Sequence, residues 1–516
     1  MFTVENPFPN QFIFKSSNEP HWYICRSLEA NMQYEEFREA GHYLVDYITK
    51  YLQEVESKPL FPDVEPSVLY KLFDEPLPTG TQSLKEIQEV VEENLVPYCT
   101  HVNHPGYMGL ITPSPNPAGI LADFLASALN QNPGAWSIGP SSVVMERLVL
   151  RWLTDLIGYD DKAGGNLTSG GMTANFIGAK LGRDATTGNK AQFEGLTGKW
   201  AAYVSEERHV SIDKAIDSVG IGRNNLRILP TNDNFSVDVN ALEEAIAKDK
   251  AAGIKPIMII ALAGTTNLGA VDDLEALSAI AKRENCWLHA DAAYGGGMLL
   301  SHKYPGKLKG IHLADSVTID PHKWFYAPLD AGAILVKDHD QLTRSFGISP
   351  AYLTDQTEQK DERYLFYVHG FEQSKRFRSL KVWMSFHHYG KDKIGEWIDR
   401  NIDEAKHLHE LAIAEDVFTS ATEPMMSAVC LRYNMQGASN ETLMKLHHEA
   451  AERIERTGQF WFGTTEMKGY TWFRINPVNI NTRMEHMDKL YALLKETCKQ
   501  VEKDMKVMSE EKMSEE

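Results

Sequence analysis

The chain has 516 residues and a formal net charge of −19, with 52 Lys and Arg against 71 Asp and Glu. Hydrophobic residues make up 43% and charged residues 24% of the chain, which is ordinary for a folded protein and excludes wholesale disorder. A chain this acidic repels nucleic acid and anionic membranes, so we expect neither as a partner. The length predicts two or three domains with a large core.

The first residues lack the basic start and apolar core of a secretory signal. No apolar run approaches the roughly 20 residues that span a bilayer. The five cysteines are scattered without a CxxC pair, which is typical of unpaired thiols in a reducing compartment. These observations predict a cytoplasmic protein whose partners are small molecules or other proteins.

In chain order, residues 1–30 show no periodicity and predict an extended arm. Residues 34–55 and 82–96 show helical spacing of apolar residues and predict two helices, separated by Pro59, Pro62 and Pro66. The middle of the chain then alternates apolar runs with helical patterns such as 272–284. The runs predict strands at 200–204, 256–263, 286–290, 316–319 and 332–336.

Apolar strands separated by helices predict a doubly wound α/β domain with a parallel sheet covered on both faces. After about residue 381 the pattern changes to longer helices, at 393–415 and 439–456, with short strands near 428–433 and 471–475. This change predicts a smaller α+β domain. The last residues, KDMKVMSEEKMSEE, are charged and low in complexity, so we expect them to fray.

Four segments of the α/β region carry residues suited to chemistry. The first, LTSGGMTAN, links a predicted strand to a helix, and Gly170 and Gly171 there expose backbone N–H groups to an anion. A tight strand-to-helix turn needs glycine as well, so phosphate binding and a structural turn fit this segment equally. The GK[ST] ending of a P-loop is missing.

The second and third segments each place a polar residue at or just beyond the end of a strand. His209 lies in SEERHVSIDKA, where a lone histidine is more often incidental. Asp291 lies in HADAAYGGG, at the edge where open α/β sheets bind ligands, and its buried charge needs a positive partner. A metal site built from His289, Asp291, His302 and His312 is the competing interpretation, but nothing in the spacing favours it.

The fourth segment is DPHKW, in which Lys323 follows an apolar strand and precedes aromatic residues. A surface lysine is the ordinary alternative. This setting instead favours a desolvated amine with a lowered pKa that can form a Schiff base. A phosphate cradle, an aspartate for a pyridinium nitrogen, a flat ring to stack and a Schiff-base lysine are together what pyridoxal phosphate requires.

The chain resembles the group II pyridoxal-phosphate decarboxylases of fold type I from about Tyr34 to about Leu493. The resemblance is carried by HPGYMG, LTSGGMTAN, SEERHVSIDKA, AGTTNLGAVDD, HADAAYGG, DPHKW and KRFRSLKVW, and FPDVEPSVL is similar to the aromatic amino-acid decarboxylases in particular. It implies decarboxylation of an L-amino acid by a homodimer with active sites at the interface. It also implies an N-terminal helical dimerisation arm (1–115), a large cofactor-binding α/β domain (116–385) and a small C-terminal α+β domain (386–516).

The resemblance implies a role for each site residue. Lys323 would form the Schiff base, Asp291 would keep the ring nitrogen protonated, and His209 would stack on the ring. The remaining cofactor contacts would come from Gly170, Gly171, Met172, Thr266, Ala293, Asp320 and His322. Tyr352, on a polar mobile loop, would reprotonate the carbanion, and related enzymes that form aldehydes carry phenylalanine there.

The chain also departs from the family pattern. Asp320 stands where many relatives have asparagine, and because a carboxylate repels a phosphate, we expect Asp320 to point away or to be protonated. Met172 replaces a hydroxyl residue, which leaves only its backbone for the phosphate. Leu110, Asn132 and Gly134 replace residues of the animal aromatic enzymes' substrate pocket.

The substrate therefore stays open. An aromatic L-amino acid is the first choice, and histidine or an aliphatic or acidic amino acid is the second. Three alternatives to decarboxylation remain: oxidative formation of an aldehyde with the same cofactor, cofactor binding without turnover as an interaction module, and metal-dependent hydrolysis.

Overall fold

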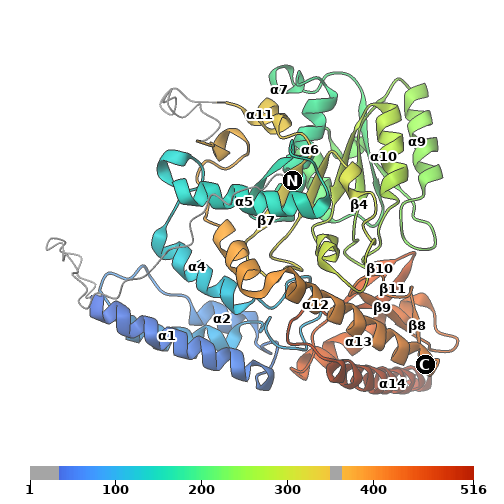
Figure 1. The fold of residues 1–516 in the computed structure, drawn as a ribbon. Coiled ribbons are helices and arrows are strands. Elements are labelled where there is room, and N and C mark those ends of the chain that lie inside the picture. The colour runs from blue at the N-terminus through green and yellow to red at the C-terminus, as the bar shows by residue number, and fades with distance from the viewer. Residues whose placement is uncertain (1–33, 349–362, 516) are drawn as a thin grey trace, which may run out of the picture.

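The computed structural model describes residues 34–348 and 363–515 (Figure 1). The predicted arm at 1–30 and most of the predicted mobile loop, including Tyr352, lie outside these residues. Among the described residues, no helix is both long and apolar enough to cross a lipid bilayer. The helices are α1 (Tyr34–Glu54), α2 (Pro66–Leu72), α3 (Leu84–Asn94), α4 (Pro117–Leu129), α5 (Pro140–Ile157), α6 (Gly171–Thr186), α7 (Ala191–Glu194), α8 (Val210–Ser218), α9 (Val239–Ala251), α10 (Leu274–Glu284), α11 (Asp340–Phe346), α12 (Ser379–Ala414), α13 (Asn440–Arg456) and α14 (Met484–Glu515).

A seven-stranded sheet with the order β1-β7-β6-β5-β4-β2-β3 forms the centre of the larger part. Its strands are β1 (Gly164–Thr168), β2 (Trp200–Ser205), β3 (Leu226–Leu229), β4 (Lys255–Leu262), β5 (Trp287–Asp291), β6 (Ser316–Ile319) and β7 (Gly332–Val336). Neighbouring strands from β6 to β3 pair in parallel, whereas β7 is antiparallel to both β1 and β6. The prediction of an α/β fold with a mainly parallel sheet is confirmed.

The direction of β7 differs from the parallel arrangement predicted for all five apolar runs. The connection from β6 to β7, residues 320–331, contains no helix. A parallel neighbour needs a crossover long enough to return the chain to the opposite end of the sheet, and this connection is too short for that. The chain therefore turns back beside β6, and this turn carries Lys323.

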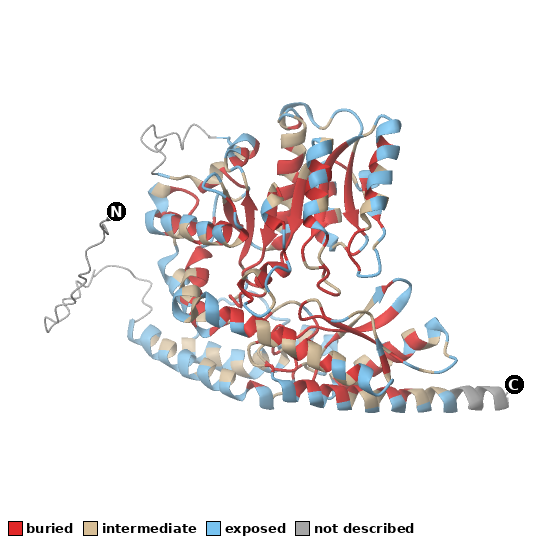
Figure 2. Cartoon of the chain, turned by 45° about the vertical axis from the view of Figure 1, so that its right-hand side comes forward, coloured by how far each residue is buried: buried red, intermediate tan, exposed pale blue. Residues whose placement is uncertain are grey.

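Alternate side chains of each strand bury opposite faces of the sheet. In β4, Ile259 and Ala261 pack with α5, α9 and α10, whereas Met258 and Ile260 pack with α6 and α8. Figure 2 shows the strands buried between helices that expose only their outer sides. Because both faces are covered, ligands can reach the sheet only at its edges.

A second sheet of four antiparallel strands, with the order β10-β11-β9-β8, lies in the C-terminal part. Its strands are β8 (Phe418–Ser420), β9 (Val429–Tyr433), β10 (Gly463–Met467) and β11 (Tyr470–Ile475). It packs with the second half of α12 and with α13 and α14. The predicted boundary at 385–386 falls inside α12, near the break at Gly390, where φ is +72°; the three domain boundaries stay predictions.

The C-terminal residues were predicted to fray, but α14 continues to Glu515. Glutamate, lysine and methionine, which dominate this segment, are good helix formers even where they bury little surface. The charged composition that suggested disorder is therefore also compatible with a continuous helix.

Candidate active site

The polar residues singled out from the sequence meet at one edge of the large sheet. The strands β1, β2, β4, β5 and β6 run in the same direction, so their carboxyl ends share this edge. A cavity of about 280 Å³ lies there. It is lined by Gly170, Gly171, Met172, Asn175, Glu207, His209, Ser211, Leu262, Gly264, Thr265, Thr266, Asp291, Ala293, Tyr294, Asp320 and Lys323.

Asp291 is the last residue of β5 and is 9% exposed. Its Oδ2 accepts a hydrogen bond from Asn175 Nδ2 at 2.8 Å, and its Oδ1 accepts one from the Ala293 backbone N–H at 3.1 Å. These two bonds hold the carboxylate in one orientation at the cavity wall. An aspartate held this way can pair with a protonated ring nitrogen.

His209 is the N-cap residue of α8 and opens onto the cavity as an exposed residue. Its Nδ1 lies 2.9 Å from Ser211 Oγ and accepts a bond from the Ser211 backbone N–H at 3.2 Å. Protein packed around the ring lowers the pKa of His209, and the Lys323 ammonium lowers it further against the opposing effect of Asp291. A neutral, flat ring beside the cavity is suited to stacking on a cofactor.

Lys323 lies in the turn after β6, and its Nζ is 3.3 Å from Asp320 Oδ2. Asp320 is 1% exposed at its side chain and also faces His322 Nε2 at 3.5 Å. Burial opposes ionisation of Asp320, but Lys323, His322 and the Gly171 N–H together lower its pKa below the ordinary value. The expectation that Asp320 points away or is protonated is wrong, because the tight turn directs its carboxylate back toward Lys323 and His322.

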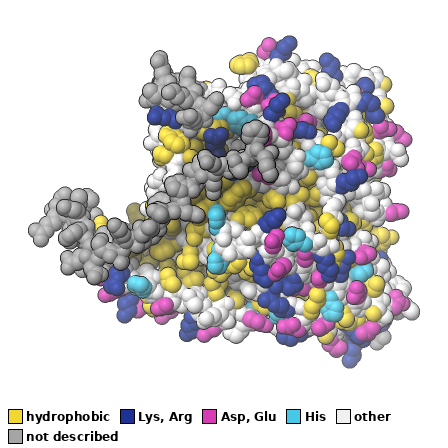
Figure 3. Space-filling view, in the orientation of Figure 1, with side chains coloured by type: hydrophobic (Ala, Val, Ile, Leu, Met, Phe, Trp, Pro, Cys, Tyr) yellow, Lys and Arg dark blue, Asp and Glu magenta, His cyan; other side chains and the backbone are white. Residues whose placement is uncertain are grey.

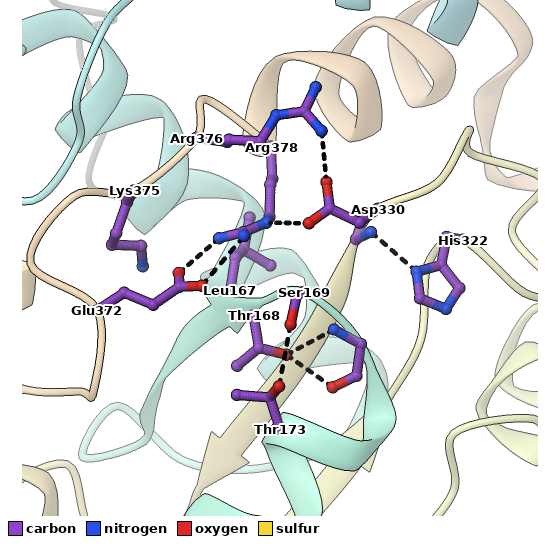
Figure 4. Close-up of polar contacts among 12 residues, drawn as sticks. Leu167, Thr168, Ser169, Thr173, His322, Asp330, Glu372, Lys375, Arg376 and Arg378 are labelled. Carbon is purple, nitrogen blue, oxygen red and sulfur yellow. Dashed lines mark hydrogen bonds and ion pairs between the residues drawn. The ribbon is translucent and has the colours of Figure 1, made fainter. Parts of the chain in front are cut away.

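The segment between β1 and α6 forms a close-fitting turn. Thr168 Oγ1 accepts a bond from the Gly170 N–H at 3.3 Å and donates one to the Gly170 carbonyl at 3.1 Å, and Ser169 Oγ lies 2.9 Å from Thr173 Oγ1 (Figure 4). Gly170 has φ of +155°, and a Cβ atom there would lie 3.0 Å from His322. The turn therefore needs glycine at this position.

The start of α6 is as closely packed at Gly171, where a side chain would not fit. A Cβ atom on Gly171 would lie 2.7 Å from Asp320 Oδ2 and 3.1 Å from Ala293. The first N–H groups of α6 have no partner within the helix, so they can bind an anion. Asp320 Oδ1 is buried without a hydrogen-bond partner among the described residues. Together with Asp291, His209 and Lys323, this cradle fits pyridoxal phosphate.

The loop that carries Lys323 is braced by the KRFRS segment. Asp330 binds both Arg376 Nη1, at 2.9 Å, and Arg378 Nε, at 3.0 Å, and Arg378 pairs with both oxygens of Glu372 (Figure 4). These ion pairs hold the loop through Asp330. This segment is one of those that carry the family resemblance, but no role was predicted for it from the sequence.

Of the remaining predicted residues Ala293, Thr266 and His322, the first two line the cavity. The Thr266 carbonyl accepts two bonds from Arg474, at 2.9 and 2.6 Å. His322 is not a lining residue; its Nδ1 accepts a bond from the Ala331 N–H at 2.9 Å, which turns Nε2 toward Asp320.

The structure also describes Asn132 and Leu110, two of the residues that depart from the family pattern. Asn132 uses its side-chain oxygen to accept bonds from the Gly134 and Lys375 backbones, at 2.9 and 3.0 Å. Leu110 is 55% exposed. The exposure of Leu110 leaves it available for contact with another chain or a substrate.

Sequence reasoning missed Asn175, Ser211 and Glu207, which also line the cavity. Asn175 and Ser211 lie within the quoted segments LTSGGMTAN and SEERHVSIDKA, and each is at most 2% exposed. The sequence analysis gave neither residue a role of its own. Among the described residues, no group of three or more His, Cys, Asp or Glu side chains is arranged to hold a metal ion.

Comparison with known proteins agrees with this geometry. Residues 66–434 match the model of the pyridoxal-dependent decarboxylase conserved domain. The chain is 32% identical to an aromatic-L-amino-acid decarboxylase of Bacillus atrophaeus, over 90% of this chain and 96% of the relative. It is 27% identical to a phenylacetaldehyde synthase of Arabidopsis thaliana, over 90% of this chain and 96% of the relative.

The fold is similar to the crystal structure of Oryza sativa TDC with PLP and tryptamine, with a TM-score of 0.86 and 27% identity. That comparison covers 92% of this chain and 99% of the other. The cofactor of this protein is pyridoxal phosphate, and its reaction class is that of a carboxy-lyase. The chain belongs to the pyridoxal-dependent decarboxylase family.

Proposed function

We propose that this enzyme converts an aromatic L-amino acid into the corresponding amine and CO2. The observation that carries the proposal is that Gly171, His209, Asp291 and Lys323 line one cavity at the carboxyl edge of the sheet. Bound pyridoxal phosphate supplies an electron-accepting ring on which the electrons of the broken bond to carboxylate can delocalise.

The role proposed for each residue follows from its position in the cavity. Lys323 is proposed to hold the cofactor covalently, because its amine enters the cavity from the turn after β6. Asp291 is proposed to keep a proton on the ring nitrogen, since both of its oxygens are already fixed by donors. His209 is proposed to cover one face of the ring. The first N–H groups of α6, including that of Met172, are proposed to bind the phosphate.

The proton that replaces CO2 at Cα needs a separate donor. We assign it to Tyr352, on the evidence of the family resemblance, although this residue lies outside the described part of the chain. A phenol that closes over the site can donate the proton and exclude water at once. This assignment favours amine over aldehyde, the product suggested by the name of the Arabidopsis relative.

An aromatic substrate is supported by relatives named for aromatic amino acids, among them tryptophan decarboxylase 2 of Oryza sativa at 28% identity. The test is turnover on a panel of common L-amino acids with CO2, amine, hydrogen peroxide and ammonia measured together. We expect equimolar CO2 and amine from an aromatic substrate, without peroxide. Amine from histidine or an aliphatic or acidic amino acid alone would contradict the aromatic assignment, and peroxide with ammonia would indicate the aldehyde reaction.

A homodimer is proposed because helices of the N-terminal part expose apolar side chains. On α4, Leu121, Phe124, Leu125 and Leu129 are each between 46% and 53% exposed. In Figure 3 hydrophobic side chains gather at the centre of the face on which Figure 1 draws α4. Apolar patches of this kind mark protein interfaces.

Sedimentation of the holoenzyme tests the dimer. We expect the parent to sediment as a dimer and Phe124→Asp to give inactive monomers. Phe193→Asp is the matched control, because Phe193 is an apolar side chain 87% exposed on α7, in the large domain. A fully active monomeric parent would contradict the proposal.

A further inference from the structure

A network of buried polar side chains connects Asp291 and His209, in the cavity wall, to His289 inside the sheet. Its members are Asn175 of α6, Ser211 of α8, His289 of β5 and Ser316 of β6, and each is at most 2% exposed. So far Asn175 and Ser211 have appeared only as single contacts of Asp291 and His209, and His289 and Ser316 have been given no role. Buried polar groups that form a complete network orient one another more strictly than single contacts do.

Asn175 is the centre of this network. Its Nδ2 donates to Asp291 Oδ2 at 2.8 Å and to Ser211 Oγ at 2.9 Å, so both amide hydrogens are used. Its Oδ1 lies 3.0 Å from His289 Nε2. Exchanging the amide oxygen and nitrogen would point Oδ1 at the Asp291 carboxylate, where two acceptors repel, so the orientation of the amide is determined.

The amide orientation fixes the tautomer of His289. Because Asn175 Oδ1 can only accept, the hydrogen lies on His289 Nε2. His289 Nδ1 lies 2.8 Å from Ser316 Oγ, its cross-strand neighbour, and that hydroxyl accepts from Trp287 Nε1 at 2.9 Å. The Ser316 hydroxyl therefore donates to Nδ1. Burial lowers the pKa of His289 to about 4, which keeps the ring neutral.

The second branch of the network reaches His209. Ser211 Oγ accepts from Asn175, so its own hydrogen is available to His209 Nδ1 at 2.9 Å, and the Ser211 backbone N–H points to the same nitrogen. His209 Nδ1 is thus an acceptor. The hydrogen of the neutral ring lies on Nε2, the far corner of the ring from Ser211.

The fold makes room for this arrangement at Gly178, one turn after Asn175 on α6. A Cβ atom on Gly178 would lie 2.4 Å from His289 Cε1. The helix therefore passes directly over the histidine ring, and the close approach brings Asn175 within reach of His289 Nε2.

We propose that His289 is a positioning residue that, through Asn175 and Ser211, fixes the Asp291 carboxylate and the His209 ring together. The inference rests on the cofactor roles proposed above for Asp291 and His209. The alternative is that these buried polar groups merely satisfy one another. A positioning role predicts that a substitution of His289 alters the binding and orientation of the cofactor, whereas a purely structural role predicts that it does not.

The test compares His289→Leu, His289→Gln and Ser211→Ala with the parent. Leucine leaves Asn175 Oδ1 without a donor, whereas a glutamine amide can again donate to it. The readouts are the dissociation constant of pyridoxal phosphate, the visible circular dichroism of the bound cofactor, which reports the tilt of its ring, and kcat and KM. His447→Leu is the matched control: His447 is a fully buried histidine of the small domain, bonded to Thr471 and Tyr433, whose pKa burial lowers to about 4.

We expect His289→Leu to weaken cofactor binding about tenfold, to reduce the dichroism, and to lower kcat about a hundredfold at nearly constant KM, the size typical of a misplaced catalytic group. His289→Gln should recover most of each loss. Ser211→Ala, which leaves the Asp291 branch intact, should change the dichroism and lower kcat about tenfold with cofactor affinity within about twofold of the parent.

Parent-like affinity and dichroism in His289→Leu would overturn the inference, as would equal losses in His447→Leu. If His289→Leu does not fold, Ser211→Ala serves as the test, because this substitution removes only one oxygen atom. Unchanged dichroism and kcat in Ser211→Ala would then overturn the inference. A parent that released no amine from any amino acid would contradict the proposed function. Cofactor affinity and dichroism do not depend on turnover, so they would still test the role of His289.

Discussion

Replacing Asp320 by asparagine should strengthen the binding of pyridoxal phosphate. The Asp320 carboxylate is buried, ionised, and directed at Lys323, His322 and the Gly171 N–H, which is one of the groups proposed to bind the phosphate. The carboxylate and the phosphate therefore compete for the same donor and repel each other. Asparagine has the same shape without the charge.

The magnitude follows from the separation of the charges. At roughly 6 Å and an effective dielectric constant of about 20, two unit charges repel by about 3 kcal/mol. Lys323 already offsets part of the carboxylate charge, so we expect about half of this, which is a roughly tenfold tighter dissociation constant.

The assay is equilibrium titration of the apoenzyme with pyridoxal phosphate at low salt, followed by absorbance. Asp315→Asn is the control, because Asp315 precedes β6 at the opposite end of the strand and accepts from the Leu288 N–H at 2.8 Å. It should bind the cofactor like the parent. Unchanged or weaker binding by Asp320→Asn would refute the repulsion argument.

Three further predictions follow from the site and the core. Asp291→Asn should lower turnover at least about a thousandfold, or ~4 kcal/mol, in steady-state assays, and near-normal activity would contradict its role. Lys375→Met leaves the buried Glu146 carboxylate unpaired and should lower the free energy of unfolding in urea by about 3–5 kcal/mol; a loss below about 1 kcal/mol would show that the pair is not stabilising. Tyr352→Phe should still release CO2 but shift the product from amine toward aldehyde with oxygen uptake, and amine formation at the parent rate without oxygen uptake would show that another group supplies the proton.

Much of the fold could be predicted because its strands are apolar on both faces. The runs at β2, β4, β5 and β6 were found within a residue or two, since each is bounded by a helix or a turn. The strand β3 was missed: it is a short edge strand in which Ile228 is 43% exposed, so its pattern is too weak to distinguish from a loop.

Site residues were predictable where a chemically suitable side chain lay near the end of a predicted strand. Lys323, Asp291 and Gly170 each lie at the end of a strand or within about four residues after it, and the strand ends share one edge of the sheet. The orientation of Asp320 was not predictable, because it depends on a turn that brings residues i and i+3 together. Asn175 was not recognised, and His289 was considered only as a metal ligand, because a hydrogen-bond network between a helix and a strand leaves no spacing signal in either segment.

The assignment of Lys323 as the cofactor lysine can be tested by reducing the holoenzyme with borohydride and mapping its peptides. We expect a single pyridoxyl group on Lys323, and a yellow parent whose Lys323→Ala variant no longer holds the cofactor covalently. A pyridoxyl group on any other lysine, or covalent retention by Lys323→Ala, would show that another residue forms the Schiff base.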